Sequence, residues 1–320
     1  ETDVAGLSIY WVAAHLISTG SLEIGQLVAF MDYLFHAMFS IMLFCTVFMM
    51  YPRAEVSAKR IEEVFNLDPI IKNKPADSDF DEKVSIEFDH VTFVYPDGEE
   101  PVLQDVSFKA NKGEMIAFIG STGSGKSTLV NLVPRFYDVS SGSIKINGKD
   151  IRDYDVLELR DKLGVIPQKA VLFSGTIADN IRFGKKDASD EEVEYAAKVA
   201  QAYPFIMEKE NGFDEEISEG ATNVSGGQKQ RLSIARALVR KAQIYIFDDS
   251  FSALDFKTDA ILRKELKKEM TESIMLVVAQ RISSIMEADQ IIVLNEGKVV
   301  GKGTHHPVSY THLRAHETRS

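Results

Sequence analysis

The stretch IGSTGSGKST, Ile119–Thr128, carries the most information about the fold of this chain. It fits the phosphate-binding pattern G-x-x-x-x-G-K-S, known as a P-loop, with its fixed positions at Gly120, Gly125, Lys126 and Ser127. An apolar run, Met115–Ile119, precedes the loop as a buried strand should, and a helix-compatible run, Lys126–Val133, follows it. A glycine-rich turn with a chance lysine is the alternative. The strand–loop–helix context disfavours it, so the sequence predicts nucleotide binding.

The residue types of the loop match the chemistry of phosphate binding. Gly123 and Gly125 allow the backbone to fold closely around phosphate oxygens, and successive N–H groups then point inward as an anion nest. The helix that begins there adds the positive end of its dipole. Lys126 is expected to reach the β- and γ-phosphates, and the Ser127 hydroxyl is expected to bind Mg²⁺. The expected nucleotide contacts are Gly120, Ser121, Thr122, Gly123, Ser124, Gly125, Lys126, Ser127 and Thr128.

Composition limits the remaining classes of function. The chain has 320 residues, of which 45% are hydrophobic, enough for a sizeable core and about two domains. The formal net charge of −12 argues against nucleic acid as a partner, because no basic surplus exists to neutralise phosphates. A single cysteine, Cys45, excludes an intrachain disulfide. The chain begins at Glu1 without a methionine or a signal-peptide pattern, so we expect a piece of a longer protein.

Residues 1–66 have the pattern of the C-terminal part of a transmembrane domain. We expect spans at about residues 4–18 and 27–51, and the second is long enough to cross a bilayer, which takes about 20 residues. A buried core helix is the alternative, which the all-round apolar surface disfavours. Arg53, Lys59 and Arg60 follow the second span, so the positive-inside rule places the next domain in the cytoplasm. We expect a multi-pass protein of the plasma membrane.

Two ionisable residues lie inside the second span. Asp32 and His36 are four positions apart, so they share one face of a helix. Ionisable groups inside a membrane often line a substrate or proton pathway. A position among the lipid headgroups or in water is the ordinary alternative for this pair.

The pattern changes after a linker at residues 67–83, which carries two prolines and many charges. The next stretch, VSIEFDHVTFVY, alternates as strands do. Helical patterns cover Asp190–Ala202, Ser225–Arg240 and Asp255–Met270, and apolar strand patterns cover Gln243–Phe247, Ser273–Val278 and Gln290–Leu294. Strands that alternate with helices predict an α/β domain, residues 84–304, with the P-loop at the carboxyl end of a strand.

The apolar strand IYIFD ends in two carboxylates, Asp248 and Asp249. The carboxyl end of a strand delivers side chains to the edge of the sheet that carries the P-loop. We therefore expect Asp248 to hold Mg²⁺ beside Ser127, directly or through water.

The most specific of the remaining motifs is NVSGGQKQRLSIARAL, Asn223–Leu238. Ser225, Gly226 and Gly227 open a helix and form a phosphate-sized nest at its positive end, although a capped helix start would use the same residues. The string SGGQ-x-Q-R, which includes Gln228, resembles the signature motif of ABC transporters. The resemblance covers nearly everything from Val4 to Thr304, and the spans are similar to the last helices of an exporter half-transporter.

The resemblance implies roles for further residues. Tyr95 would lie against the adenine base, and Gln168 in GVIPQ would be the Q-loop glutamine, which senses Mg²⁺ and the membrane domain and belongs to both the metal and the catalytic set. Glu219 stands where exporters carry a glutamate that contacts the coupling helices. SALD, Ser252–Asp255, is similar to the D-loop, and LFSGTIADNIRFG is similar to the helical subdomain.

The resemblance also implies ligands and partners. In this family two ATP-binding domains close head to tail, with ATP between each P-loop and the signature of the other chain. ATP and Mg²⁺ are the implied cofactors. The implied partners are a second half-transporter, the lipid bilayer and an exported substrate chosen by the membrane cavity. Nucleotide contacts on the partner's side would come from Ser225, Gly226, Gly227 and Gln228.

Two positions depart from the family pattern. A glutamate usually follows the Walker B aspartate and activates the attacking water, whereas this chain has Asp249, which is shorter by about 1.3 Å. A misplacement of that size can cost on the order of a hundredfold in rate. The switch histidine of VAHR is replaced by Gln280, which donates a hydrogen bond but cannot become cationic. Asp249 and Gln280 together predict the degenerate half of a heterodimeric exporter, which binds ATP and cleaves it slowly.

Two other functions remain open at this point. The chain could be a self-sufficient homodimeric exporter that hydrolyses ATP with Asp249 and Gln280. It could also be a soluble ABC protein of DNA repair or translation, which the expected spans and the acidic balance oppose.

Residues 305–320 break the family pattern. PVSYTHLRAHETRS resembles a translated adapter read-through, so we expect a disordered, non-native tail. For the same reason we expect no metal site at His305, His306, His312 and His316.

Overall fold

A computed structural model describes residues 2–75, 84–280 and 285–304. Contacts divide the chain into two units, Glu1–Ile70 and Ile71–Ser320, and each is described here by itself. The tail expected at residues 305–320 and residues 76–83 of the linker expected at residues 67–83 lie outside the described residues. Residues 71–75 of that linker belong to the second unit.

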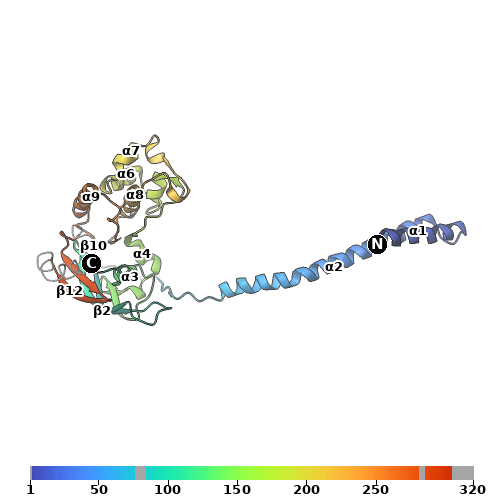
Figure 1. Cartoon of the computed structure of the whole chain (residues 1–320), viewed down its shortest axis with the longest axis horizontal. Helices are drawn as coiled ribbons and strands as arrows, with labels where there is room; N and C mark the ends of the chain where they lie inside the picture. The colour runs from blue at the N-terminus through green and yellow to red at the C-terminus, as the bar shows by residue number, and fades with distance from the viewer. Residues whose placement is uncertain (1, 76–83, 281–284, 305–320) are drawn as a thin grey trace. The chain divides into compact units, whose positions relative to one another are not determined.

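The first unit consists of two helices, α1 (Thr2–Ser18) and α2 (Ile24–Phe65). With 42 residues α2 is about 63 Å long, roughly twice the hydrocarbon thickness of a bilayer. Figure 1 shows α2 as one continuous helix. It runs through Pro52 into the charged stretch, and none of its side chains is buried. Among the described residues, α2 is the one helix long and apolar enough to cross a membrane, with a mean hydropathy of 1.9, whereas α1 is shorter.

The larger sheet of the second unit has the order β12-β11-β3-β10-β9-β6. Its strands are β3 (Met115–Ile119), β6 (Leu163–Ile166), β9 (Ile244–Asp248), β10 (Ile274–Val278), β11 (Gln290–Asn295) and β12 (Lys298–Gly303). All neighbours are parallel except β11 and β12, which pair antiparallel. Strands β9 and β10 are buried along their whole length, which explains why they read as continuous apolar runs.

A smaller antiparallel sheet, in the order β2-β1-β4-β5, packs against the larger one. It comprises β1 (Ser85–Phe93), β2 (Leu103–Asn111), β4 (Ser141–Ile146) and β5 (Lys149–Asp150). The P-loop helix α3 (Lys126–Leu132) shares their core. Phe88 stacks on Phe108, and Phe108 meets Phe118 of β3 edge to face at 5.2 Å, so aromatic rings join the two sheets.

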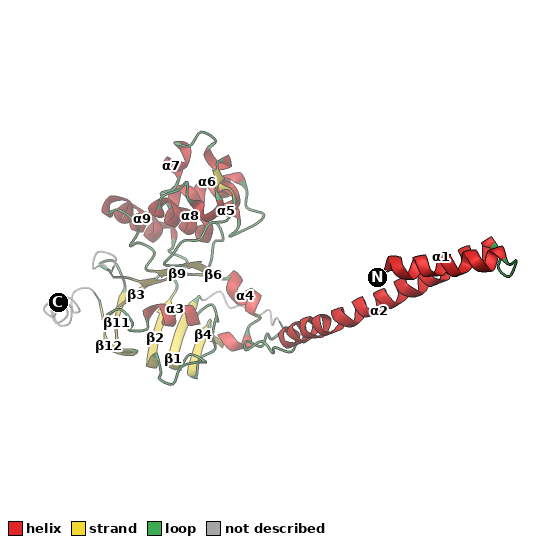
Figure 2. Ribbon diagram, turned by 45° about the vertical axis from the view of Figure 1, so that its right-hand side comes forward, coloured by secondary structure: helices red, strands yellow, loops and turns green. Residues whose placement is uncertain are grey.

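The remaining helices form the third part of this unit. Figure 2 shows α5 to α9 gathered on one side of the strands, whereas α4 lies beside the smaller sheet. The elements are α4 (Val156–Asp161), α5 (Ile177–Arg182), α6 (Asp190–Val199), α7 (Tyr203–Met207), α8 (Gly226–Leu238), α9 (Phe256–Glu269), the 3₁₀ turns η1 (Ile151–Asp153), η2 (Gly212–Asp214) and η3 (Glu219–Ala221), and the strands β7 (Gly175–Thr176) and β8 (Glu216–Ile217). The α/β fold class that the sequence predicts is therefore confirmed.

Helix α4 offers a matched test of the core. Leu159 is fully buried and Leu157, two positions away on the same helix, is 70% exposed. We expect Leu159→Ala to lower the free energy of unfolding by about 2–5 kcal/mol, because it removes buried methyl groups and leaves a cavity. Leu157→Ala should change it by less than about 0.5 kcal/mol. Denaturant unfolding of both variants checks this, and equal losses would contradict the packing described.

Candidate nucleotide site

The P-loop joins the carboxyl end of β3 to the first turn of α3. Gly125 is the N-cap residue of α3 and has φ +94°, a left-handed conformation that favours glycine. A Cβ atom at Gly120 would lie 2.1 Å from the carbonyl oxygen of Leu294, which no side chain can do. Backbone conformation and space therefore both require glycine in this loop.

Lys126 points its ammonium group into the loop. Its Nζ donates to the carbonyl oxygens of Gly120 at 2.9 Å and Ser121 at 2.7 Å, and to the Ser124 hydroxyl at 3.3 Å. Burial lowers the pKa of Lys126, whereas the carboxylates of Asp249 and Asp248 act in the opposite direction. A cation held by neutral oxygens at a helix start suits a polyanionic ligand.

Ser127 and Asp248 bring a hydroxyl and a carboxylate together. The Ser127 hydroxyl donates to Oδ1 of Asp248 at 2.7 Å, from the first turn of α3 to the end of β9. Burial raises the pKa of Asp248, and the hydrogen bond from Ser127 and the charge of Lys126 oppose this rise. Oxygen ligands of this kind fit Mg²⁺, which is often held by a hydroxyl and one carboxylate beside phosphates.

The Asp249 carboxylate is hydrogen-bonded to two amide side chains, each of which follows a strand next to β9. Its Oδ2 accepts hydrogen bonds from Nε2 of Gln280 at 2.8 Å and from Nε2 of Gln168 at 3.3 Å. Its backbone has φ +48°, and its N–H donates to the carbonyl oxygen of Val278 at 3.1 Å. The structure therefore brings together the three residues that the sequence predicts as catalytic, with the carboxylate between two neutral donors.

Tyr95 lies beside the P-loop helix. Its hydroxyl is 3.0 Å from the hydroxyl of Thr128, and its ring meets those of Phe93 and Tyr137 edge to face at 4.8 and 5.2 Å. Tyr95 is thus fixed close to the loop by a small aromatic cluster.

The four signature residues lie at the start of α8, in the helical part of the unit (Figure 2). The Ser225 hydroxyl accepts from the N–H of Gln228, and the Gln228 side chain accepts from the N–H of Ser225, which is a capping box. Ser225 and Gly226 are exposed, and a Cβ at Gly226 would meet no atom within 4 Å. The beginning of this helix is therefore open to solvent in this chain.

Two buried residues to which the sequence assigned no role, one of them the second glutamine of SGGQ-x-Q-R, hold the two residues before Gln168 in place. Gln230 of α8 donates to the carbonyl oxygen of Pro167 at 3.2 Å, and Ser250 donates to that of Ile166 at 2.9 Å. Both side chains are at most 2% exposed. The sequence could have indicated these residues, because each is a polar residue among apolar ones, on a helix face or at a strand end. A polar side chain at such a position usually makes a buried hydrogen bond.

Two further predictions concern residues outside the nucleotide site, namely the pair Asp32 and His36 and the exposed Glu219. In α2 the side chains of Asp32 and His36 face each other at 3.7 Å, so they do share one helical face. Glu219 begins η3 and is exposed. Neither observation tests the role expected for these residues.

The fold and the loop define the second unit as a P-loop nucleotide-binding domain. Residues 103–252 match the family model of the ABC transporter, which spans the P-loop and the signature. The chain contains an ABC transporter ATP-binding domain.

Several known proteins are similar to this chain. An uncharacterized ABC transporter ATP-binding protein of Mycobacterium tuberculosis is 39% identical over 95% of the chain and 53% of its own length. The uncharacterized protein YfiB of Bacillus subtilis is 42% identical over 93% and 52%. A Staphylococcus aureus protein, whose name includes "multidrug export ATP-binding/permease protein", is 40% identical over 98% and 55%. The chain spans about half the length of these relatives.

A solved structure agrees with these relatives. The chain superposes on a bacterial Atm1-family ABC exporter with ATP bound at a TM-score of 0.85 and 31% identity. The match covers 98% of this chain and 55% of that one. The fold is therefore that of an ABC ATPase joined to an apolar helix, as in an Atm1-type exporter.

Two glycines test the loop geometry. We expect Gly120→Ala to weaken ATP binding by more than about tenfold, because the new Cβ would displace the loop from its position. Gly148→Ala is the control, since Gly148 also has a positive φ, +79°, but a Cβ atom there would meet no other atom within 4 Å. It should cost backbone strain of about 1–2 kcal/mol and leave the affinity within about twofold. Titration with a fluorescent ATP analogue measures both, and similar affinities for the two variants would contradict the prediction.

Proposed function

We propose that this chain is the ATP-binding part of an ABC exporter subunit, which couples ATP binding and hydrolysis to export of a substrate across a membrane. One observation carries the proposal: Lys126 and the Ser127–Asp248 pair meet at the edge of the sheet where Asp249 also lies. The apolar helix α2 and the exporter relatives support the membrane part of the proposal.

Each residue of the site has a role in this proposal. Lys126 and the P-loop N–H groups bind the phosphates of ATP, and Tyr95 takes the adenine base. Ser127 and Asp248 hold Mg²⁺, with Gln168 close to it; bound there, the ion neutralises phosphate charge. Asp249 orients the attacking water, and Gln280 donates toward the γ-phosphate. The residues Ser225, Gly226, Gly227 and Gln228 complete the site of the partner chain.

Hydrolysis at this chain's own site is proposed to be slow. Asp249 is shorter than glutamate, and its carboxylate already accepts from two amides. Gln280 is a neutral donor, so it cannot place a positive charge beside the phosphate. These two features favour a site that holds ATP and a partner that supplies most of the turnover.

The assembly follows from the same reasoning. The partner is a second half-transporter, and a heterodimer is favoured over a homodimer because a slow site needs a competent one beside it. Residues 1–66 belong to the transmembrane domain, residues 67–83 form the linker and residues 84–304 form the ATP-binding domain. Arg53, Lys59 and Arg60 follow the apolar stretch, and the positive-inside rule therefore supports an ATP-binding domain on the cytoplasmic side of the plasma membrane.

A double substitution tests the slow site. In the full-length subunit with its partner, we expect Asp249→Glu/Gln280→His to raise ATP turnover at this site by about tenfold or more, because it restores reach and a titratable donor. Single-turnover hydrolysis with the partner's P-loop lysine replaced isolates this site. Adding Lys126→Ala to the double variant should abolish the gain.

Two results would favour the alternatives. A subunit that hydrolyses ATP rapidly without a partner, and loses this activity with Lys126→Ala, indicates a homodimeric exporter. Recovery of the intact protein in the soluble fraction after cell lysis indicates a soluble ABC protein.

A further inference from the structure

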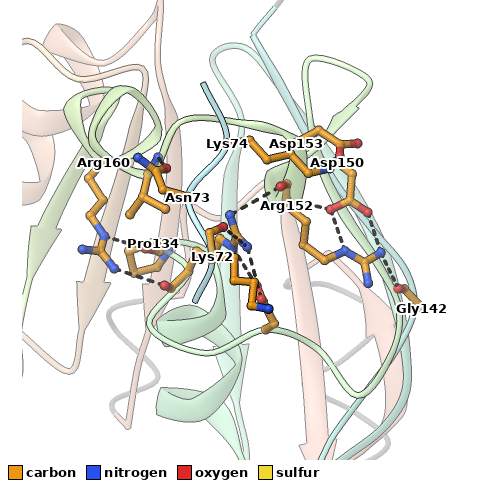
Figure 3. A network of polar contacts seen from close by, with 12 residues as sticks. Lys72, Asn73, Lys74, Pro134, Gly142, Asp150, Arg152, Asp153 and Arg160 are labelled. Carbon is orange, nitrogen blue, oxygen red and sulfur yellow. Dashed lines mark hydrogen bonds and ion pairs between the residues drawn. The ribbon is translucent and has the colours of Figure 1, made fainter. Parts of the chain in front are cut away.

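A short segment at the start of the second unit, residues 71–74, is hydrogen-bonded to helix α4 and to the end of the P-loop helix (Figure 3). The segment begins five residues after Asn66, the C-cap of α2. Lys74 pairs with Asp153 and the carbonyl oxygen of Lys72 accepts from Arg135, while the Asn73 side chain reaches Asp155.

Asn73 completes the N-terminal cap of α4. The first N–H groups of a helix lack partners within the helix. The Asp155 side chain accepts from the N–H groups of Leu157 at 2.8 Å and Glu158 at 3.1 Å. Oδ1 of Asn73 accepts from the N–H of Val156 at 2.8 Å, and Nδ2 of Asn73 donates to Oδ2 of Asp155 at 2.6 Å. The donors of Glu158 and Asn73 hold the pKa of Asp155 below its usual range.

Helix α4 is in turn tied to the end of the P-loop helix. Arg160 donates to the carbonyl oxygens of Pro134 at 3.0 Å and Arg135 at 3.1 Å, just after α3 (Figure 3). Arg135 is only 3% exposed and donates back to the carbonyl oxygen of Lys72 at 3.3 Å. The segment, α4 and the end of α3 therefore form one closed set of hydrogen bonds.

Helix α4 also leads directly to the catalytic edge of the sheet. It ends at Asp161, and β6 runs from Leu163 to Ile166, two residues before Gln168. Gln168 then reaches the carboxylate of Asp249. A shift of α4 along its axis would move β6, and with it the amide that orients this carboxylate.

We propose that Asn73 is a positioning residue for the nucleotide site, and that it links the chain leaving α2 to Gln168 through the cap of α4. This rests on the proposed function, in which Gln168 and Asp249 serve hydrolysis. The exposed pair of Lys74 and Asp153 adds little, because both side chains are at least half exposed. The specific element is the two side-chain hydrogen bonds of Asn73. Its Nδ2 donates to the Asp155 carboxylate, and its Oδ1 accepts from the N–H of Val156.

The test uses the full-length subunit in complex with a partner whose P-loop lysine is replaced, so that kcat reports hydrolysis at this chain's own site. Asn73→Ala should speed amide hydrogen exchange at residues 156–168 by about fivefold, the effect of losing a helix cap. It should lower kcat for ATP by a similar factor and leave the KM unchanged, because the P-loop contacts remain. Lys72→Ala is the control, since Lys72 takes part through its carbonyl oxygen, and it should match the wild type in both measurements.

A swap of the two side chains provides the rescue. Asn73→Asp alone sets two carboxylates against each other, and Asp155→Asn alone sets two amide donors against each other, so both should behave like Asn73→Ala. The double variant Asn73→Asp/Asp155→Asn restores a donor facing an acceptor and should recover exchange and kcat to within about twofold of the wild type.

Two outcomes would overturn the inference. One is wild-type kcat in Asn73→Ala from a complex that hydrolyses ATP; the other is unchanged exchange at residues 163–168. A complex that keeps both P-loop lysines and still shows no ATP turnover would instead contradict the proposed function. The exchange measurement tests the inference even then, because it does not depend on hydrolysis.

Discussion

The hydrogen bond from Ser127 to Asp248, 2.7 Å long, is the contact that holds the site together. It joins the first turn of the P-loop helix to the end of β9, although β10 separates β9 from β3 in the sheet. Parallel strands make this possible, because their carboxyl ends all meet at one edge. The loop glycines allow the close approach of the backbone, and the buried strands keep the edge rigid.

The order of strands along that edge explains why the Asp249 carboxylate accepts two hydrogen bonds from amide side chains. Gln280 follows β10, Asp249 follows β9 and Gln168 follows β6, and these three strands are neighbours. The carboxylate therefore lies between two amides, both of which donate to the same oxygen. A carboxylate that accepts two hydrogen bonds is held in a fixed geometry, and the proposal of slow hydrolysis at this site rests on that observation.

The same edge is connected to the chain that comes from α2. The first N–H groups of α4 donate to the side chains of Asp155 and Asn73. Arg160, near the end of α4, donates to the chain just after the P-loop helix. The ATP-binding unit therefore includes residues that a composition-based boundary assigns to a linker. Residues 72 and 73 are thus hydrogen-bonded to the turn after the P-loop helix and to the first turn of α4.

Local sequence was enough to predict the P-loop, the α/β class, the apolar helix and the position of Asp248 at the end of a strand, because these depend on glycine conformations, apolar runs and short motifs. The roles of Asp249 and Gln280 follow from the family resemblance and stay predictions. Four contacts became visible only in the folded chain. Gln168 and Gln280 both donate to Asp249, Gln230 donates to the carbonyl oxygen of Pro167, and Asn73 donates to Asp155, 82 residues away at the cap of α4. Such contacts join residues far apart in the chain. They follow from strand order and packing, which no local pattern of residues encodes.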